Sequence, residues 1–570
     1  MAKKITQNVN KDKLFNDEPK VRPDFSIWKN RHTNYQSCNL GQIVPIYYSE
    51  VLPNERKQVR LGMISHTTTP VAPIFNSLYT EIRSFFIPLR LCADLLNGYN
   101  ERKSPWVKVF GEDNASASAQ VIVPLANQTL PDISTQAATN MAASVSAVDT
   151  ANADNIFDSL DLVGLASSKK ANYLTLAAYE LIYQRHYRNE NYEAATESDL
   201  YKLLFNAYNS VTSFTIPSTF AFEMANREKD YFTGAKPFTQ KGDSIKVGLV
   251  GSAPIVGSSY YHDVGSSGAH FSDQNGAPTS GGMVIVDSTG AGKIFYNTDP
   301  EMTGNNVNIN YTNLVADLKS VNGISIEELR LLIKTQELLE KDAIYGSLYA
   351  ESLNAHFGCC PLDLTLQDPQ ELFKTTITSN MQAIFQTSST SGEASILGTI
   401  GANSTTQTDP FVILPETHFK EHGIVMICAV HKLQNVYDTR YFIPKFNYKK
   451  SRFDFFTPEL NDLGYQPLTD DEMRSSSSSI AGFNEAFADY RYVFNKSHGS
   501  LNKSFVYWAP AISNEYSSIA ALYKEGAGIL NKALSVTSSI APQFYDAWGF
   551  EELCTKPMSL HSIPGFDGVI

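Results

Sequence analysis

The chain has 570 residues with 42% hydrophobic and 18% charged side chains, the composition of a folded globular protein rather than of a disordered chain. Its formal net charge of −13 excludes a protein that binds nucleic acid through its overall charge. No apolar run reaches the ~20 residues that span a bilayer, and the N-terminus lacks the apolar segment of a secretion signal, so we expect no membrane insertion.

The first part of the chain predicts an arm followed by strands. Residues 1–40 mix charged residues, Asn and Pro without periodicity, which is typical of an extended N-terminal arm. β-Branched and aromatic residues then dominate 43–53, 57–69 and 78–91, and Pro and Asn separate these runs. Each run therefore predicts a strand.

Two later segments have the periodicity of helices. Residues 174–189 place apolar and aromatic side chains three and four positions apart, on one face. Ser325 and Glu328 form a capping box, which marks the start of a helix whose apolar face includes Leu329, Leu332, Ile333, Leu339 and Ala343. We expect both helices to pack against the body rather than hold a cofactor. Strand character returns at 411–456 and 504–508.

Three polar segments interrupt these elements, at about 112–155, 251–313 and 388–409. They are rich in Gly, Ser, Asn or Thr and have few large apolar side chains, so they predict long exposed insertions. Residues 41–570 are therefore predicted to form a single mainly β domain, with these insertions and a few flanking helices.

The cysteines and the catalytic motifs argue against an enzyme. Six cysteines at 38, 92, 359, 360, 428 and 554 contain no C-x-x-C pair, which favours reduced structural thiols and a cytoplasmic assembly site. Residues 418–422 match the zinc-binding pattern H-x-x-E-H, but they follow Pro415 and lead into a strand-like run. Residues 288–294 lack the first glycine and the hydroxyl of a phosphate-binding loop. Acidic residues are plentiful, and no segment singles out a catalytic carboxylate pair. We therefore predict no catalytic residue, no metal and no cofactor.

One local basic segment is a candidate for nucleic-acid contact. Residues 440–453 alternate cations with aromatic residues, the combination that neutralises phosphates and stacks exposed bases. The alternative is a strand and turn with one solvated face and one buried face. The candidate nucleic-acid-binding residues are Lys3 and Lys4 in the arm, with Arg440, Lys445, Lys449, Lys450 and Arg452.

Several sequence blocks in consistent order resemble the major capsid proteins of the Microviridae, especially the gokushovirus-like branch. The most recognisable is Arg227-Glu-Lys-Asp-Tyr-Phe-Thr-Gly-Ala-Lys-Pro237, followed by Gln240-Lys-Gly242. It departs from the family at Lys236 and at Phe238-Thr239, where the family carries Leu and Trp-Pro. The other blocks lie at 40–53, 69–75, 85–91, 178–191, 328–358, 386–390, 421–423, 452–456, 488–492 and 562–565.

The resemblance implies an eight-stranded antiparallel jelly roll with two four-stranded sheets. It also implies a T=1 icosahedral shell around circular single-stranded DNA, assembled in the host bacterial cytoplasm, with surface loops that meet a host receptor. Its implied partners are copies of itself, a small internal DNA-binding protein, a pilot protein and a scaffolding protein. The alternative is a β-sandwich protein that binds or hydrolyses host polysaccharide.

Overall fold

The structure is a computed structural model that describes 25–93, 156–162, 174–194, 198, 200–202, 221–243, 245, 326–345, 349–359, 368–379, 411–474, 480–514 and 519–561, with some short strands elsewhere. Contacts divide the chain into two compact units. The first comprises Met1–Thr239 and Tyr345–Ile570, and the second comprises Gln240–Ile344.

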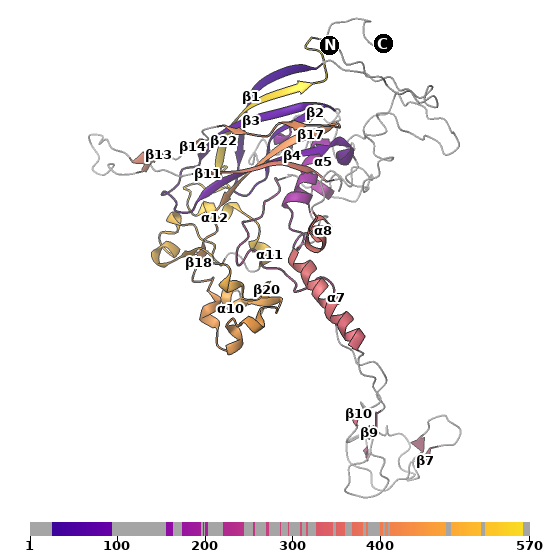
Figure 1. The fold of residues 1–570 in the computed structure, drawn as a ribbon. Coiled ribbons are helices and arrows are strands. Elements are labelled where there is room, and N and C mark those ends of the chain that lie inside the picture. The colour runs from indigo at the N-terminus through magenta and orange to yellow at the C-terminus, as the bar shows by residue number, and fades with distance from the viewer. Residues whose placement is uncertain are drawn as a thin grey trace, which may run out of the picture. The chain divides into compact units, whose positions relative to one another are not determined.

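The first unit contains two antiparallel sheets, and Figure 1 shows their long strands in two layers. The six-stranded sheet has the order β1 (Ser26–Cys38), β22 (Phe544–Lys556), β3 (Arg56–Thr67), and then β14 (Thr405–Gln407), β15 (Val412–Ile413) and β16 (Thr417–His418), which all pair with β3. The four-stranded sheet has the order β11 (Gln370–Ser379), β4 (Leu78–Pro88), β17 (Gly423–Leu433) and β2 (Val44–Val51).

The core lies between these sheets. Strand β3 buries every second residue, including Val59, Leu61 and Met63, because successive side chains of a strand point to opposite faces. Trp548 is fully buried at the middle of β22. Strand β17 is buried along all of its residues, since it is central in its sheet and covered on both faces.

Short helices and turns surround the sheets of the first unit. The α-helices are α1 (Leu89–Ala93), α4 (Ile156–Ser159), α5 (Leu174–Ile182), α8 (Tyr349–Phe357), α10 (Asp470–Met473), α11 (Ile519–Leu522) and α12 (Ala527–Asn531). Helix α5 continues as the π-helical turn η2 (Tyr183–Tyr187), and 3-10 turns are η5 (Lys445–Tyr448), η6 (Arg452–Asp454), η7 (Pro458–Leu460), η8 (Ala488–Tyr490), η9 (Gly499–Asn502) and η10 (Val506–Trp508). Two-stranded pairs are β12 (Ile384–Phe385) with β13 (Ile400–Ala402), β18 (Tyr437–Asp438) with β21 (Lys496–Ser497), and β19 (Tyr465–Thr469) with β20 (Ile480–Glu485).

The second unit contains most of α7 (Ile326–Tyr345). Its strand pairs are β5 (Ile255–Val256) with β10 (Val315–Ala316), β6 (His270–Ser272) with β9 (Asn308–Asn310), and β7 (Ile285–Val286) with β8 (Ile294–Phe295). Across the described residues of the chain, no helix is both long enough and apolar enough to cross a membrane.

The mainly β, antiparallel architecture with a few helices is confirmed. The predicted strands at 43–53, 57–69 and 78–91 correspond to β2, β3 and β4, although the last three predicted residues begin α1. The helices predicted at 174–189 and from Ser325 correspond to α5 with η2 and to α7, while Ser325 itself lies outside the described residues.

The strand predicted at 504–508 is wrong, and the one predicted at 411–456 is wrong in part. Residues 504–508 contain the 3-10 turn η10, and the end of 411–456 contains η5 and η6. In η6, the Asp454 carboxylate accepts the backbone N–H groups of Lys450 and Ser451, a local bond pattern that competes with strand pairing.

The predicted arm and insertions are only partly described. Residues 26–38 form the edge strand β1, in which each residue is paired with β22, whereas residues 1–24 lie outside the described part of the chain. Periodicity missed β1 because it has exposed residues on both faces. The insertion at 112–155 lies outside the described residues, and those at 251–313 and 388–409 are described only as short strands.

A buried carboxyl in α5 makes the stability of the fold dependent on pH. Glu180 is fully buried, the side-chain amide of Gln184 donates to its Oε1 at 2.6 Å, and the Ser198 hydroxyl donates to its Oε2 at 3.1 Å. Burial raises the pKa of Glu180 to about 8, since the loss of water outweighs these two hydrogen bonds and the charge of Arg188. The folded state therefore holds a proton here at pH values where the unfolded chain has lost it.

We expect Glu180→Gln to remove this dependence. In the wild type, the contribution of Glu180 is fully present below pH ~4.5 and is lost as the pH rises through about 8, because folding takes up a proton in that window. At pH 9 the variant should therefore be more stable than the wild type, by up to about 4 kcal/mol. Urea unfolding at pH 5 and pH 9 measures the difference, and equal pH slopes for the two proteins would contradict the prediction.

Candidate functional site

In the predicted basic segment, some cations form ion pairs within the chain, and others form none with a described residue. The Arg440 guanidinium donates to both carboxylate oxygens of Asp438, with its shortest contact at 2.6 Å. The Lys449 ammonium is almost completely buried, pairs with Asp489 and lies 3.9 Å from the ring centroid of Tyr490. These two cations are neutralised within the chain, so they hold loops together rather than offer charge to a ligand.

The remaining predicted cations are closer to solvent. Lys445 donates to the side-chain oxygen of Gln466 at 3.2 Å. Lys450 and Arg452 are exposed, and neither forms an ion pair with any residue in the described part of the chain. Exposed Phe446 and Phe453 lie in the same segment. Lys3 and Lys4 lie outside the described residues.

The H-x-x-E-H pattern does not form a helix. His418 is in β16, and residues 419–422 form the connection to β17. Glu421 forms a bidentate ion pair with Arg90, with its shorter contact at 2.7 Å. The interpretation of this segment as a turn that leads into a strand is confirmed.

The described cysteines are free thiols. Cys38, Cys92, Cys428 and Cys554 are buried, while Cys359 is exposed. Burial raises the pKa of Cys428 to about 12, which leaves its thiol protonated and unreactive. Cys360 lies outside the described residues.

A buried polar cluster joins the two sheets, and we call Cys38, Ser65, Thr80, His431 and Asp546 the intersheet cluster. The imidazole of His431 in β17 contacts Asp546 Oδ2 in β22 at 2.7 Å through Nε2 and Thr80 Oγ1 in β4 at 2.9 Å through Nδ1. The Ser65 hydroxyl of β3 donates to Asp546 Oδ1 at 2.5 Å. The Cys38 thiol of β1 lies 3.7 Å from Asp546 Oδ2.

This cluster has a structural rather than a chemical role. Single ligand atoms of Cys38, His431 and Asp546 lie within 4.8 Å of one another, a spacing that a metal ion could use. However, both imidazole nitrogens and both carboxylate oxygens already have partners, and the Phe544 ring stacks on His431 at 4.1 Å. The hydrogen bonds account for the arrangement without an ion, and they connect the opposing sheets through the core.

Sequence reasoning missed the intersheet cluster. Its five residues come from five strands, so no local motif contains them. Ser65 gives a weak signal. It occupies the next buried position of β3 after Val59, Leu61 and Met63, but its side chain is polar. A polar residue in such a position needs a buried partner.

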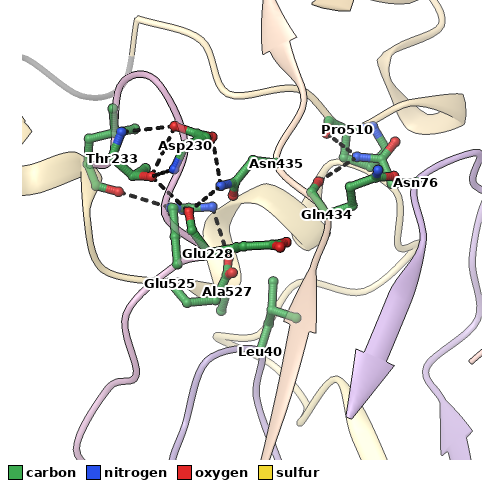
Figure 2. A network of polar contacts seen from close by, with 12 residues as sticks. Leu40, Asn76, Glu228, Asp230, Thr233, Gln434, Asn435, Pro510, Glu525 and Ala527 are labelled. Atoms are coloured by element: carbon green, nitrogen blue, oxygen red, sulfur yellow. Dashed lines mark hydrogen bonds and ion pairs between the residues drawn. The ribbon is translucent and has the colours of Figure 1, made fainter. Parts of the chain in front are cut away.

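A second polar network surrounds the loop 227–237 (Figure 2). Asp230 Oδ1 accepts the backbone N–H groups of Phe232 and Thr233, each at 2.9 Å. Asp230 Oδ2 accepts the Asn435 amide at 2.9 Å and the Tyr437 hydroxyl at 2.7 Å. The carboxylate therefore fixes the loop on the strand region after β17.

The same loop contains a fully buried ion pair. Arg227 donates to Glu525 Oε1 at 2.9 Å and to the Leu522 carbonyl at 3.0 Å, and both charged side chains are 1% exposed. Burial raises the pKa of Glu525, although Arg227 opposes the shift. Glu525 also packs on Gly41, which has a positive φ. Because a Cβ atom at Gly41 would lie 2.7 Å from the Glu525 side chain, the position has room for hydrogen alone.

These observations describe a mainly β protein in which buried polar groups connect sheets and loops. Comparison with known proteins agrees: the family described as "Capsid protein (F protein)" matches residues 22–566, and the chain belongs to that family. The resemblance to Microviridae capsid proteins is thereby confirmed, and the role of the protein is that of a capsid component rather than an enzyme.

Curated relatives match over nearly their whole length. The chain is 26% identical to "Capsid protein VP1" of Spiroplasma virus 4, over 95% of this chain and 97% of that protein. It is 25% identical to "Capsid protein VP1" of Bdellovibrio phage phiMH2K, over 96% and 97% of the two chains. It is also 25% identical to "Capsid protein VP1" of Chlamydia phage 1, over 97% of each chain.

Proposed function

We propose that this capsid protein is the shell-forming subunit of a T=1 icosahedral particle, in which about 60 copies enclose circular single-stranded DNA. The observation that carries the proposal is the family match over residues 22–566, which includes both sheets and the surrounding loops. A shell subunit distributes its binding energy over several interfaces related by symmetry, and it needs no catalytic pocket.

The body of this subunit is proposed to be an eight-stranded jelly roll. Strands β14, β15 and β16 pair with successive parts of β3, so they act as three pieces of one interrupted strand. With these pieces counted as one position, each sheet is four strands wide. Two four-stranded antiparallel sheets that share a core are the arrangement of a jelly roll.

The insertions and the arm are proposed to serve the particle surface and interior. The segments 112–155 and 251–313 would face outward, and one of them would meet the host receptor. Deletion of one segment with normal shells and normal infection would contradict that assignment. Assembly would take place in the host cytoplasm with a scaffolding protein, a pilot protein and a small internal DNA-binding protein.

The DNA contact of the basic segment is proposed for Lys445, Lys450 and Arg452, together with Lys3 and Lys4. Lys450 and Arg452 support it best, because they are exposed beside Phe446 and Phe453. Asp454 lies in the same turn and reduces the local positive charge. The double variant Lys450→Gln/Arg452→Gln should weaken oligonucleotide binding without loss of particle formation.

Electron microscopy of the purified protein tests the shell proposal. The protein is expressed alone and with its neighbouring phage genes at matched concentration, because a scaffold can be required. Closed uniform particles of about 250–300 Å are expected for ~60 copies around a cavity. Monomers or small oligomers in both preparations would overturn the proposal, and glycan binding and hydrolysis would then be assayed.

A further inference from the structure

The six-stranded sheet has a face that points away from the core, and we call it the open face. In antiparallel pairs, directly opposed residues share a face, so the register assigns its members. The row Arg31, Glu551, Arg60 and Ile413 crosses β1, β22, β3 and β15. Neighbouring rows add Ile27, Lys29, Tyr35, Thr555, Leu553, Tyr545, Arg56, Gln58, Ile64, His66 and His418.

The open face is basic although the whole chain is acidic. Its strands contribute Lys29, Arg31, Arg56 and Arg60 against a single carboxylate, Glu551, which leaves a formal excess of three positive charges. The other acidic residues of these strands, Asp546 and Glu552, are buried on the core side. The local charge is therefore opposite in sign to the net charge of −13.

The cations of this face differ in their partners. Lys29 and Arg31 share Glu551, at 2.6 Å and 3.0 Å. Their hydrogen bonds lower the pKa of Glu551 to about 2, so this carboxylate stays ionised at neutral pH. Arg56 and Arg60 are exposed, and neither forms an ion pair with a residue that the structure describes. Two arginines on one strand are thus available to an anionic ligand.

Exposed aromatic rings lie among these cations. Tyr35 is 78% exposed, and Tyr545 is also exposed on the same face. Phe411 covers Gly62 of β3 so closely that a Cβ atom there would lie 2.5 Å from the ring. Because Gly62 has no side chain, the Phe411 ring packs directly on the sheet, and Phe411 is still 63% exposed.

We propose that the open face binds single-stranded nucleic acid. Arg56, Arg60, Lys29 and Arg31 would contact phosphates, and Tyr35 and Tyr545 would stack unpaired bases. A sheet that presents aromatic rings and cations is a general platform for single strands, because every base has a stacking face and every nucleotide has a phosphate. Positive charge favours nucleic acid as the occupant. The site rests on the proposed function, since the enclosed DNA would be its ligand, and it adds residues outside the predicted basic segment.

The test measures how tightly the full-length protein binds a fluorescent oligothymidylate of about 20 nucleotides. Two variants change the charge of the open face in opposite directions. Arg56→Gln/Arg60→Gln should weaken binding about tenfold at low salt and reduce the salt dependence of the affinity. Glu551→Gln should strengthen binding about threefold, because it removes the single carboxylate of the face. The exposed Lys503 directly follows η9, away from these strands in the sequence, and Lys503→Gln should leave the affinity unchanged.

Stacking is tested separately at Tyr35. Tyr35→Ala should weaken binding about tenfold, whereas Tyr35→Phe should retain it, since stacking requires the ring and not the hydroxyl. The site would be overturned if Arg56→Gln/Arg60→Gln and Glu551→Gln bound the oligonucleotide with the same affinity as the wild type. It would also be overturned if Lys503→Gln weakened binding as much as Arg56→Gln/Arg60→Gln.

Particle formation by the same variants separates this site from the shell proposal. Normal particles with unchanged oligonucleotide affinity would overturn the site alone. Loss of particles in Arg56→Gln/Arg60→Gln without a change in affinity would identify the face as an interface between copies, and that outcome also overturns the site. Absence of particles from the wild type would count against the shell instead.

Discussion

Replacement of Asp546 by alanine is expected to lower the free energy of unfolding by about 3–5 kcal/mol. The carboxylate accepts the Ser65 hydroxyl and contacts the His431 imidazole in the core, so its removal leaves polar atoms without partners between the sheets. A buried donor that loses its acceptor incurs the full cost of desolvation. The loss should also prevent stable particles, because the two sheets of each subunit are joined through this side chain.

Urea unfolding measures the effect, and two variants control it. Asp546→Asn keeps the shape and one acceptor oxygen and should lie between the wild type and Asp546→Ala. Glu551→Gln changes a carboxylate on the solvent side of the same strand, which is 24% exposed, and should leave the unfolding midpoint nearly unchanged. If Asp546→Ala behaved like Glu551→Gln, the intersheet cluster would have no role in stability.

Replacement of Arg227 by methionine is expected to cost about 3–5 kcal/mol of stability, since it leaves Glu525 buried without its cation. The double variant Arg227→Met/Glu525→Met should recover much of this loss, because two apolar chains of similar length can fill the same space. The interaction energy from the double-mutant cycle should therefore be large and favourable.

Thermal or urea unfolding of the four proteins in this cycle provides the measurement. Additive losses in the double variant would show that each side chain acts through packing alone. Lys532→Met, a change at a different part-buried cation that donates to the Ala511 carbonyl, serves as a comparison for the loss of a cation elsewhere in the fold.

Local patterns in the sequence predicted the strands in which burial follows one regular pattern from end to end. Strand β3 alternates buried and exposed residues, and β17 is apolar throughout most of its length, so both agree with their local pattern. Strand β1 lacks such a pattern because it lies at an edge, where neither face is fully covered. Its pairing with β22 depends on residues more than 500 positions away, which composition cannot reveal.

The candidate site shows the same limit. Lys449 and Lys450 are adjacent in a basic segment, but the fold brings Asp489 to Lys449 and leaves Lys450 exposed. The open face combines strands from both ends of the sequence, so its excess of cations is not contained in any single segment. Family resemblance supplied the general architecture, whereas the ionic partners required the register of the strands.

The position of β22 has a consequence for the timing of folding. Strand β22 lies between β1 and β3, so the two early strands never pair with each other directly and are joined only when residues 544–556 have left the ribosome. Contacts at such large sequence separation also slow folding. A prematurely terminated chain would lack the central strand that joins them. The six-stranded sheet can therefore be completed only in a chain that has been synthesised through residues 544–556.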